Sequence, residues 1–321
     1  MNGRRRLTER CLRLFLFRTV TWIPTDEKSI QKGDDLVLEI NREEFLKTGE
    51  KYVRSTDDSL TGRVFHLAMD DGEEYELRFI TGDIVEWRSP GGPVRYERYG
   101  CLKPDEQTYF VASVLSECEP PVCVTLVLDE EQSLVTMAVS RQGFYPKRPR
   151  LSVVEFRFGA IRVQDQPLPY RRHGFTRDLV GKKINWYYST GFINTQMYTT
   201  ERYMRIRPLT DTRTPEEIAL EEKEIEQGLR PRQLLYEEPS AYIKIKNGMY
   251  LISCIEANMN RVDETRGGNN LMFVANFNRG CDFGRTFSRK GDRLDHGFFM
   301  AFGDPTDEEV PLETEPTPYR V

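Results

Sequence analysis

The sequence has few of the residues that build metal centres and disulfide frameworks. It contains three histidines and six cysteines in 321 residues, and the histidines lie far apart, at positions 66, 173 and 296. The cysteines form no CxxC pair and show none of the spacings of zinc fingers. We therefore expect no metal site, and cysteines that stay reduced in a reducing compartment.

Long apolar runs and an excess of positive charge are also missing. Lys and Arg number 46 and Asp and Glu 51, so the formal charge is 46 − 51 = −5, and the pI is about 5.6. This balance argues against a nucleic-acid partner, which usually meets a basic face. No stretch approaches the 18 apolar residues of a membrane span. The apolar run from Leu12 to Phe17 is interrupted by Arg13, unlike a signal peptide. We expect a cytoplasmic protein without a membrane partner.

Most of the chain reads as short strands joined by tight turns. Asp71-Gly72 and Gly82-Asp83 separate runs rich in β-branched and aromatic residues, as in hairpins. The segments 108–115, 122–129 and 134–140 continue the pattern, and helical periodicity is rare. The sequence predicts an all-β protein with enough consecutive strands to close a barrel.

The strand pattern occurs twice. Gly62 and Gly72 are ten residues apart, and so are Gly181 and Gly191, in similar contexts (Leu60-Thr61-Gly62 and Leu179-Val180-Gly181). A repeat at this scale predicts two similar barrels rather than a solenoid. We expect an N-terminal extension over 1–57, a first barrel over 58–166 and a second over 167–321, with the boundary near the cluster of Pro167, Pro169 and Gly174.

One helical excursion is expected inside the second barrel. Thr214, Pro215 and Glu217 resemble a capping box, and Gly228 supplies a stop. Two interpretations remain open: a solvated connection between strands, or a lid packed through Ile218, Ile225 and Leu229.

Polar residues at strand spacing mark a candidate site in the second barrel. Alternate residues of a strand share a face. Three segments show such sets: Trp186 with Tyr188; Tyr203 with Arg205 and Arg207; and Tyr250 with Ile252, Cys254, Glu256 and Asn258. A buried glutamate is costly unless paired, and Arg205 could hold Glu256 through a bidentate bond.

These segments carry a family resemblance. "SLTGRVFHLAMDDG" and "VTMAVSRQG" in the first half, and "DLVGKKINWYYSTG", "NGMYLISCIEAN" and "LDHGFFMAFGD" in the second, resemble the two domains of molybdenum cofactor biosynthesis protein F (MoaF). The resemblance runs from about residue 58 to 303, and the first 57 residues match nothing known to us. It implies two tandem calycin-like (lipocalin-like) antiparallel β-barrels.

The second half also resembles the phenolic acid decarboxylases, small calycin barrels that use no cofactor. Their tyrosine pair falls on Trp186 and Tyr188, their arginine on Arg205 and their catalytic glutamate on Glu256. The resemblance implies Tyr188, Arg205 and Glu256 as catalytic residues. The tryptophan at 186 removes one hydroxyl group from the pair, which makes simple cinnamate decarboxylation doubtful. The expected substrate-binding residues are Trp186, Tyr203, Tyr250, Cys254, Asn258 and Asn276.

The repeat supports a function for these positions. Tyr188 corresponds to Met69, Arg205 to Glu86 and Glu256 to Leu115, so the first copy lacks all three catalytic side chains. A requirement of the barrel itself should appear in both copies.

We therefore expect a cofactor-independent enzyme that binds a small apolar, oxygenated substrate. It would promote elimination or cyclisation through a quinone-methide-like intermediate, as a cyclase or pericyclase of specialised metabolism. A role in molybdenum cofactor biosynthesis and a non-catalytic carrier of an apolar ligand are the alternatives. The expected partners are a small-molecule substrate and, in a homodimer, a second copy of the chain.

Overall fold

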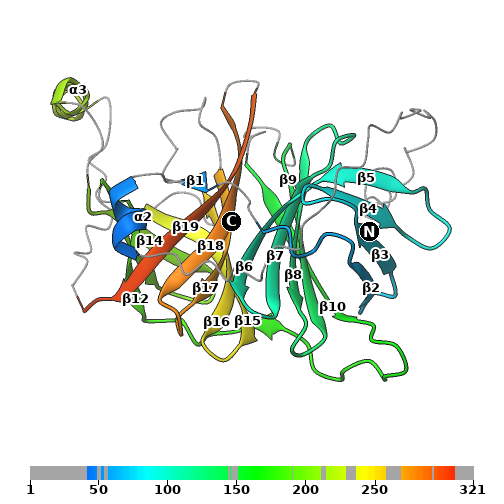
Figure 1. Ribbon diagram of the computed structural model, residues 1–321. Helices are drawn as coiled ribbons and strands as arrows, with labels where there is room; N and C mark the ends of the chain where they lie inside the picture. Colours follow the sequence, from blue (N-terminus) through cyan, green and yellow to red (C-terminus); the bar gives the residue numbers. More distant parts are fainter. Residues whose placement is uncertain are drawn as a thin grey trace, which may run out of the picture.

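The computed structural model is built almost entirely of antiparallel strands (Figure 1). It describes residues 42–48, 52–53, 57–143, 145, 151–189, 191–210, 215–228, 236–257, 269–290 and 293–307. Within these ranges, no helix combines the length and the hydropathy that crossing a membrane requires.

The first sheet forms a nearly closed barrel. Its strands follow the order β5-β4-β3-β2-β10-β9-β8-β7-β6. The strands at its two edges, β5 and β6, are separated in sequence by Tyr99 alone, so the chain itself bridges the opening. The strand bounds are β2 Val64–Met69, β3 Glu74–Phe79, β4 Ile84–Arg88, β5 Arg95–Arg98, β6 Gly100–Asp105, β7 Thr108–Val114, β8 Val122–Asp129, β9 Leu134–Arg141 and β10 Val153–Ile161.

The second sheet closes completely. Strands β12 to β19 pair in sequence order, and β19 also pairs with β12, which completes an eight-stranded ring. Two short strands, β1 Tyr52–Val53 and β11 Gly174–Phe175, add to β19 and β15. The remaining bounds are β12 Lys183–Ser189, β13 Phe192–Tyr198, β14 Tyr203–Pro208, β15 Tyr236–Lys246, β16 Met249–Glu256, β17 Asn269–Asn276, β18 Cys281–Lys290 and β19 Arg293–Pro305. The predicted fold of two tandem calycin-like barrels is confirmed.

The repeat is visible in the backbone hydrogen bonds. The Gly62 amide donates to the Phe79 carbonyl over 2.7 Å, and the Gly181 amide donates to the Tyr198 carbonyl over 2.7 Å. Both pairs span the same interval, since 79 − 62 = 198 − 181. Both glycines adopt positive φ, at 80° and 88°. The expected equivalence of Gly62 and Gly181 is confirmed.

Apolar side chains form three separate clusters. One fills the first barrel around Leu77 and Phe79. Another lies inside the second barrel around Trp186 and Phe273. The third lies between the barrels, where strands such as β7 and β8 of the first face β16 to β18 of the second. The wall that the barrels share is therefore buried on both of its faces.

A buried arginine joins the barrels within this wall. The Arg285 guanidinium is fully buried and donates to Thr125 Oγ1 over 3.0 Å and to Ser140 Oγ over 2.9 Å, both in the first barrel. It also donates to Asn270 O over 2.7 Å and to Asn270 Oδ1 over 2.8 Å. Burial lowers the pKa of Arg285. Neutral oxygen acceptors from both barrels thus solvate a buried cation.

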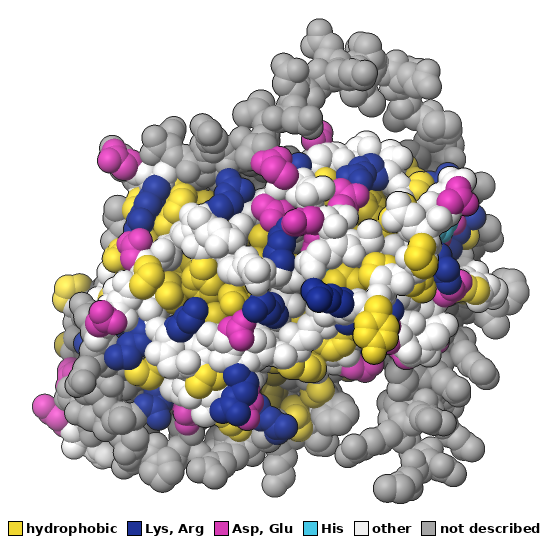
Figure 2. Space-filling model, turned by 90° about the horizontal axis from the view of Figure 1, so that it is seen from below, with side chains coloured by type: hydrophobic (Ala, Val, Ile, Leu, Met, Phe, Trp, Pro, Cys, Tyr) yellow, Lys and Arg dark blue, Asp and Glu magenta, His cyan; other side chains and the backbone are white. Residues whose placement is uncertain are grey.

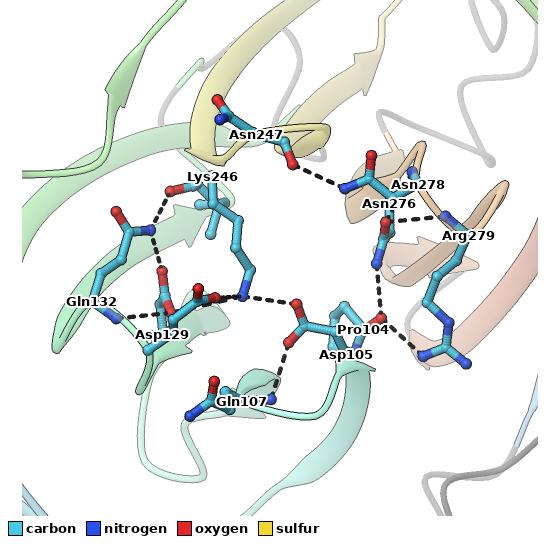
Figure 3. A network of polar contacts seen from close by, with 12 residues as sticks. Pro104, Asp105, Gln107, Asp129, Gln132, Lys246, Asn247, Asn276, Asn278 and Arg279 are labelled. Atoms are coloured by element: carbon cyan, nitrogen blue, oxygen red, sulfur yellow. Dashed lines mark hydrogen bonds and ion pairs between the residues drawn. The ribbon is translucent and has the colours of Figure 1, made fainter.

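A second polar network joins the barrels at Lys246 (Figure 3). Its ammonium lies 2.7 Å from Asp105 Oδ2 and 2.8 Å from Glu131 Oε2. Asp129, 3.9 Å from the same ammonium, also pairs with the buried His173 imidazole at 3.4 Å. His173 belongs to the segment that connects the barrels and holds it to the first barrel, while β11 of the same segment pairs with β15 of the second.

Residues from the expected N-terminal extension lie on the second barrel. Helix α2, Arg42–Thr48, directs Arg42 to Asp304 of β19 through two hydrogen bonds of 2.9 and 2.5 Å. The rings of Phe45 and Phe302 pack edge to face with centroids 5.5 Å apart. The chain therefore contacts the second barrel before it builds the first.

The expected helical excursion is present as α3, Pro215–Glu226. It begins at the proline, and Gly228 beyond its end has a φ of 68°. Figure 1 shows α3 standing apart from the barrel wall. Thr214, Leu229 and the side chains of Glu217, Ile218 and Ile225 lie outside the described residues, so the lid interpretation stays a prediction.

The surface carries charges of both signs. On the face seen in Figure 2, Lys and Arg are interspersed with Asp and Glu. Several exposed charges pair across elements, such as Lys244 with Asp178 at 2.7 Å and Arg172 with Asp70 at 2.7 Å.

The paired glycines give a direct test of the repeat. A side chain at Gly62 or Gly181 would meet no atom within 4 Å, so substitution with alanine costs only the strain of a left-handed backbone. We expect Gly62→Ala and Gly181→Ala each to lower the free energy of unfolding by about 1–2 kcal/mol in urea titrations. Gly174→Ala is the control, because that glycine is equally open without positive φ. A loss at only one of the two glycines would contradict their equivalence.

Candidate functional site

The interior of the second barrel is lined with aromatic rings. Trp186 and Tyr188 of β12 point inward, as the sequence predicts, and join the inner cluster. Trp186 packs against Phe273 with ring centroids 6.4 Å apart, and Tyr188 packs against Phe299 at 5.7 Å. These rings provide apolar, rigid walls.

A carboxyl group that makes no hydrogen bond to another side chain lies among these rings. Asp282 of β18 is fully buried, and its ladder neighbours Ala275 and Ala301 belong to the inner cluster, so its side chain points into the barrel. Neither carboxyl oxygen makes a hydrogen bond of good geometry. Burial raises the pKa of Asp282 well above its usual value, and the nearby Ala301 backbone offsets this only in part. Burial thus favours the neutral, protonated form of this group, which is the form that can donate a proton.

Two tyrosine hydroxyls lie near this acid. Burial raises the pKa of Tyr188 well above its usual value, and the nearby carboxyl groups of Asp282 and Glu256 act in the same direction. Burial likewise raises the pKa of Tyr198, with a smaller contribution from Asp282. The Tyr198 hydroxyl donates to Gln196 Oε1 over 3.3 Å. Both phenols thus remain protonated and act as hydrogen-bond donors.

Glu256 lies at the end of β16 on the inner side. It follows Tyr250, Ile252 and Cys254, which belong to the inner cluster at alternate positions. Its Oε2 accepts a hydrogen bond of 3.1 Å from Asn269 Nδ2. In the described part of the chain, no three His, Cys, Asp or Glu side chains gather as a metal site requires.

Another inward glutamate has a structural role. Glu238 of β15 is fully buried and accepts a hydrogen bond of 2.7 Å from the Ala257 amide. In the first barrel, the buried Glu97 accepts one of 2.9 Å from the Ser116 amide. Both pairs span nineteen residues. Both barrels have this glutamate–amide bond although their interiors otherwise differ. The bond therefore serves the fold and not a site that only one barrel has.

The candidate site residues Asp282, Tyr188 and Glu256, in contrast, have no polar counterparts in the first barrel. The strand ladders place Asp282 opposite Ala275 and Ala275 opposite Tyr250. The matching ladder of the first barrel runs from Tyr109 through Leu128 to Val135. Asp282 therefore corresponds to valine, as Tyr188 does to methionine and Glu256 to leucine. The first interior is apolar where the second carries an acid, a phenol and a carboxylate.

The expected inward placement of Arg205 is wrong. Met204 and Ile206 belong to the inner cluster, so the alternate residues of β14 face outward. Arg205 Nε lies 3.6 Å from Glu237 Oε1, and Tyr203 shares its outer face. The alternation was correct, but the apolar residues of this strand, rather than the arginines, point inward.

The other expected binding residues divide between the interior and the shared wall. Tyr250 and Cys254 lie inside the second barrel. The Tyr250 hydroxyl donates to Asp178 over 3.2 Å. Burial raises the pKa of the Cys254 thiol well above its usual value. Asn276 instead faces the first barrel, where its Nδ2 donates to the Pro104 carbonyl over 3.1 Å (Figure 3). Asn258 lies outside the described residues.

The sequence analysis missed Asp282 and Gln196. On β18, Asp282 alternates with Cys281 and Phe283, which gave the aspartate the appearance of a solvent-facing residue. The apolar residues face the neighbouring barrel instead. A usable signal was the repeat itself, since an aspartate stands where the first copy has a valine.

The buried acid should cost the protein stability. An aspartate whose pKa is raised on folding destabilises the fold increasingly as pH rises above its ordinary value, 3.8, toward the folded value. We expect Asp282→Val to raise the free energy of unfolding by about 1–3 kcal/mol at pH 7 and to reduce its fall between pH 5 and 8. Urea titrations at several pH values measure this. Glu238→Gln, at the bonded carboxylate, should be destabilising; a destabilised Asp282→Val protein would contradict the unpartnered placement of Asp282.

Comparison with known proteins agrees with the first barrel. Residues 41–143 match the family model of the MoaF N-terminal domain. The match starts at helix α2 and reaches the end of β9, so it includes part of the segment that the sequence analysis treated as an unmatched extension. No curated protein matches the chain. The likeness of the second half to phenolic acid decarboxylases stays a prediction, and residues 41–143 are similar to the MoaF N-terminal domain.

Proposed function

We propose that the protein is a cofactor-independent enzyme that binds an oxygenated aromatic or polyene substrate inside the second barrel. It would promote elimination followed by cyclisation through a quinone-methide-like intermediate. The observation that carries this proposal is the buried Asp282 carboxyl without a hydrogen-bond partner. A protein keeps such a destabilising group where it serves a function.

The elimination can be written with Asp282 as the acid. A hydroxymethyl phenol would receive the Asp282 proton on its benzylic hydroxyl, and the carbon–oxygen bond would break to release water. The phenol would lose its proton to the Glu256 carboxylate, which gives a neutral quinone methide. That proton then returns to Asp282, so that one water leaves and the enzyme is unchanged.

The aromatic walls and the phenols support the second step. A quinone methide carries partial negative charge on its oxygen, and the Tyr188 hydroxyl could donate to it. Trp186, Phe273 and Phe299 would hold the intermediate against an alkene and exclude water, which otherwise consumes it. Ring closure then needs no further proton.

Two other functions have support of their own. The match of residues 41–143 to the MoaF N-terminal domain supports an association with molybdenum cofactor biosynthesis. The apolar interior of the first barrel suits a carrier of an apolar ligand. Neither explains the acid in the second barrel.

A hydroxymethyl phenol with a tethered alkene tests the proposal. Liquid chromatography with mass detection should show loss of water and one enantiomer of the cyclised product, since closure in free solution gives both. Asp282→Asn should lower this turnover by about 10²–10⁴-fold, the range of general acid–base catalysis. Tyr188→Phe should cost about 1–2 kcal/mol of transition-state stabilisation, the scale of one hydrogen bond.

The matched control is Arg207→Lys, on the outer face of β14, which should turn over like the unmodified protein. Melting curves accompany each rate. Normal turnover by a folded Asp282→Asn protein would remove Asp282 from the mechanism.

A further inference from the structure

In the described part of the chain, the ionisable side chains buried inside the second barrel are all acids. Its buried inward carboxyl groups are Glu238 and Asp282, and the less buried Glu256 lies at the end of β16. Among the described residues, the buried inward-facing side chains include no Lys, Arg or His.

The cations of this barrel lie elsewhere. Arg205 and Arg207 are on the outer face of β14. Arg285 faces the first barrel, to whose Ser140 it donates. Lys244 lies at one end of the barrel, 42% exposed and paired with Asp178.

This distribution selects the charge of a ligand. A carboxylate that leaves water needs a cation or several donors to compensate its desolvation. Inside this barrel it would instead meet the carboxylates of Glu238 and Glu256, which repel it at short range. An uncharged ligand meets neither cost.

Buried polar atoms without a hydrogen-bond partner indicate which polar groups the ligand carries. Asp282 in its acid form is a donor, whereas the Asn194 Oδ1, buried opposite Trp186, is an acceptor without a partner. A molecule with a carbonyl oxygen and a hydroxyl group would satisfy both atoms.

We propose that the ligand of the second barrel is an uncharged, hydroxyl-bearing ring compound, and that this barrel excludes carboxylates. The inference rests on the proposed site but not on the proposed reaction. It separates this chain from the carboxylate substrates that the likeness to phenolic acid decarboxylases implies.

Three probes that share a 4-hydroxyphenyl ring and a two-carbon chain test the inference. They are 4-ethylphenol, which is neutral, 3-(4-hydroxyphenyl)propionate, which is an anion, and tyramine, which is a cation at pH 7. Calorimetric titration of the full chain should show 4-ethylphenol binding at least about tenfold more tightly than the propionate. Tyramine should also bind more weakly than 4-ethylphenol, because it must ionise Asp282.

Two variants test whether the acidic groups inside the barrel cause the difference in affinity. Asp282→Asn with Glu256→Gln removes acidic groups but keeps their shape, so it should narrow the difference between 4-ethylphenol and the propionate. Arg207→Lys, outside the barrel, should leave the difference unchanged. Tighter binding of the propionate or of tyramine would overturn the inference, and so would binding of none of the probes.

The outcomes separate this inference from the proposed function. Preference for 4-ethylphenol without turnover of the hydroxymethyl phenol would leave the inference standing and reject the reaction. Turnover of the hydroxymethyl phenol together with tighter binding of the propionate would support the reaction and reject the inference.

Discussion

The inside of a closed β-barrel is separated from water by its own wall, so each polar group there must find its partner within the protein or in a ligand. Glu238 meets this constraint with the Ala257 amide. Asp282 does not, because its neighbours on the ladder are alanines. The exception identifies where chemistry can occur, since an acid held neutral in an apolar chamber can give up its proton to a bound molecule.

The first barrel serves as a comparison for the site in the second barrel. Two barrels with equivalent glycines and equivalent buried glutamates differ in the centre of their interiors, where the first is apolar. The first barrel therefore shows what the fold requires, and the second shows what was added. Strand β18 concentrates the additions, because Asp282 points into the barrel while Arg285, three residues later, joins the barrels. The site is thereby built on a strand that is buried from Cys281 to Ser288.

Much of the fold could be predicted from the sequence, because strand alternation and turn glycines are local signals. Gly62, Gly181, Trp186 and Tyr188 are placed as expected. The site was harder, because alternation separates two faces without telling which one points inward. Arg205 was placed inside as a partner for Glu256, and a resemblance agreed, although its neighbours Met204 and Ile206 are the apolar pair. Asp282 was missed for the opposite reason, since the apolar face of its strand covers the other barrel. Contacts between domains leave no local pattern in the sequence.

The protonation state of Asp282 tests the central claim most directly. Infrared difference spectra between the unmodified protein and Asp282→Asn isolate the signal of this one carboxyl group. At pH 7 the account predicts the carbonyl band of a protonated acid, which a bound neutral ligand shifts by hydrogen bonding. The bands of an ionised carboxylate at pH 7, unchanged by ligand, would contradict it.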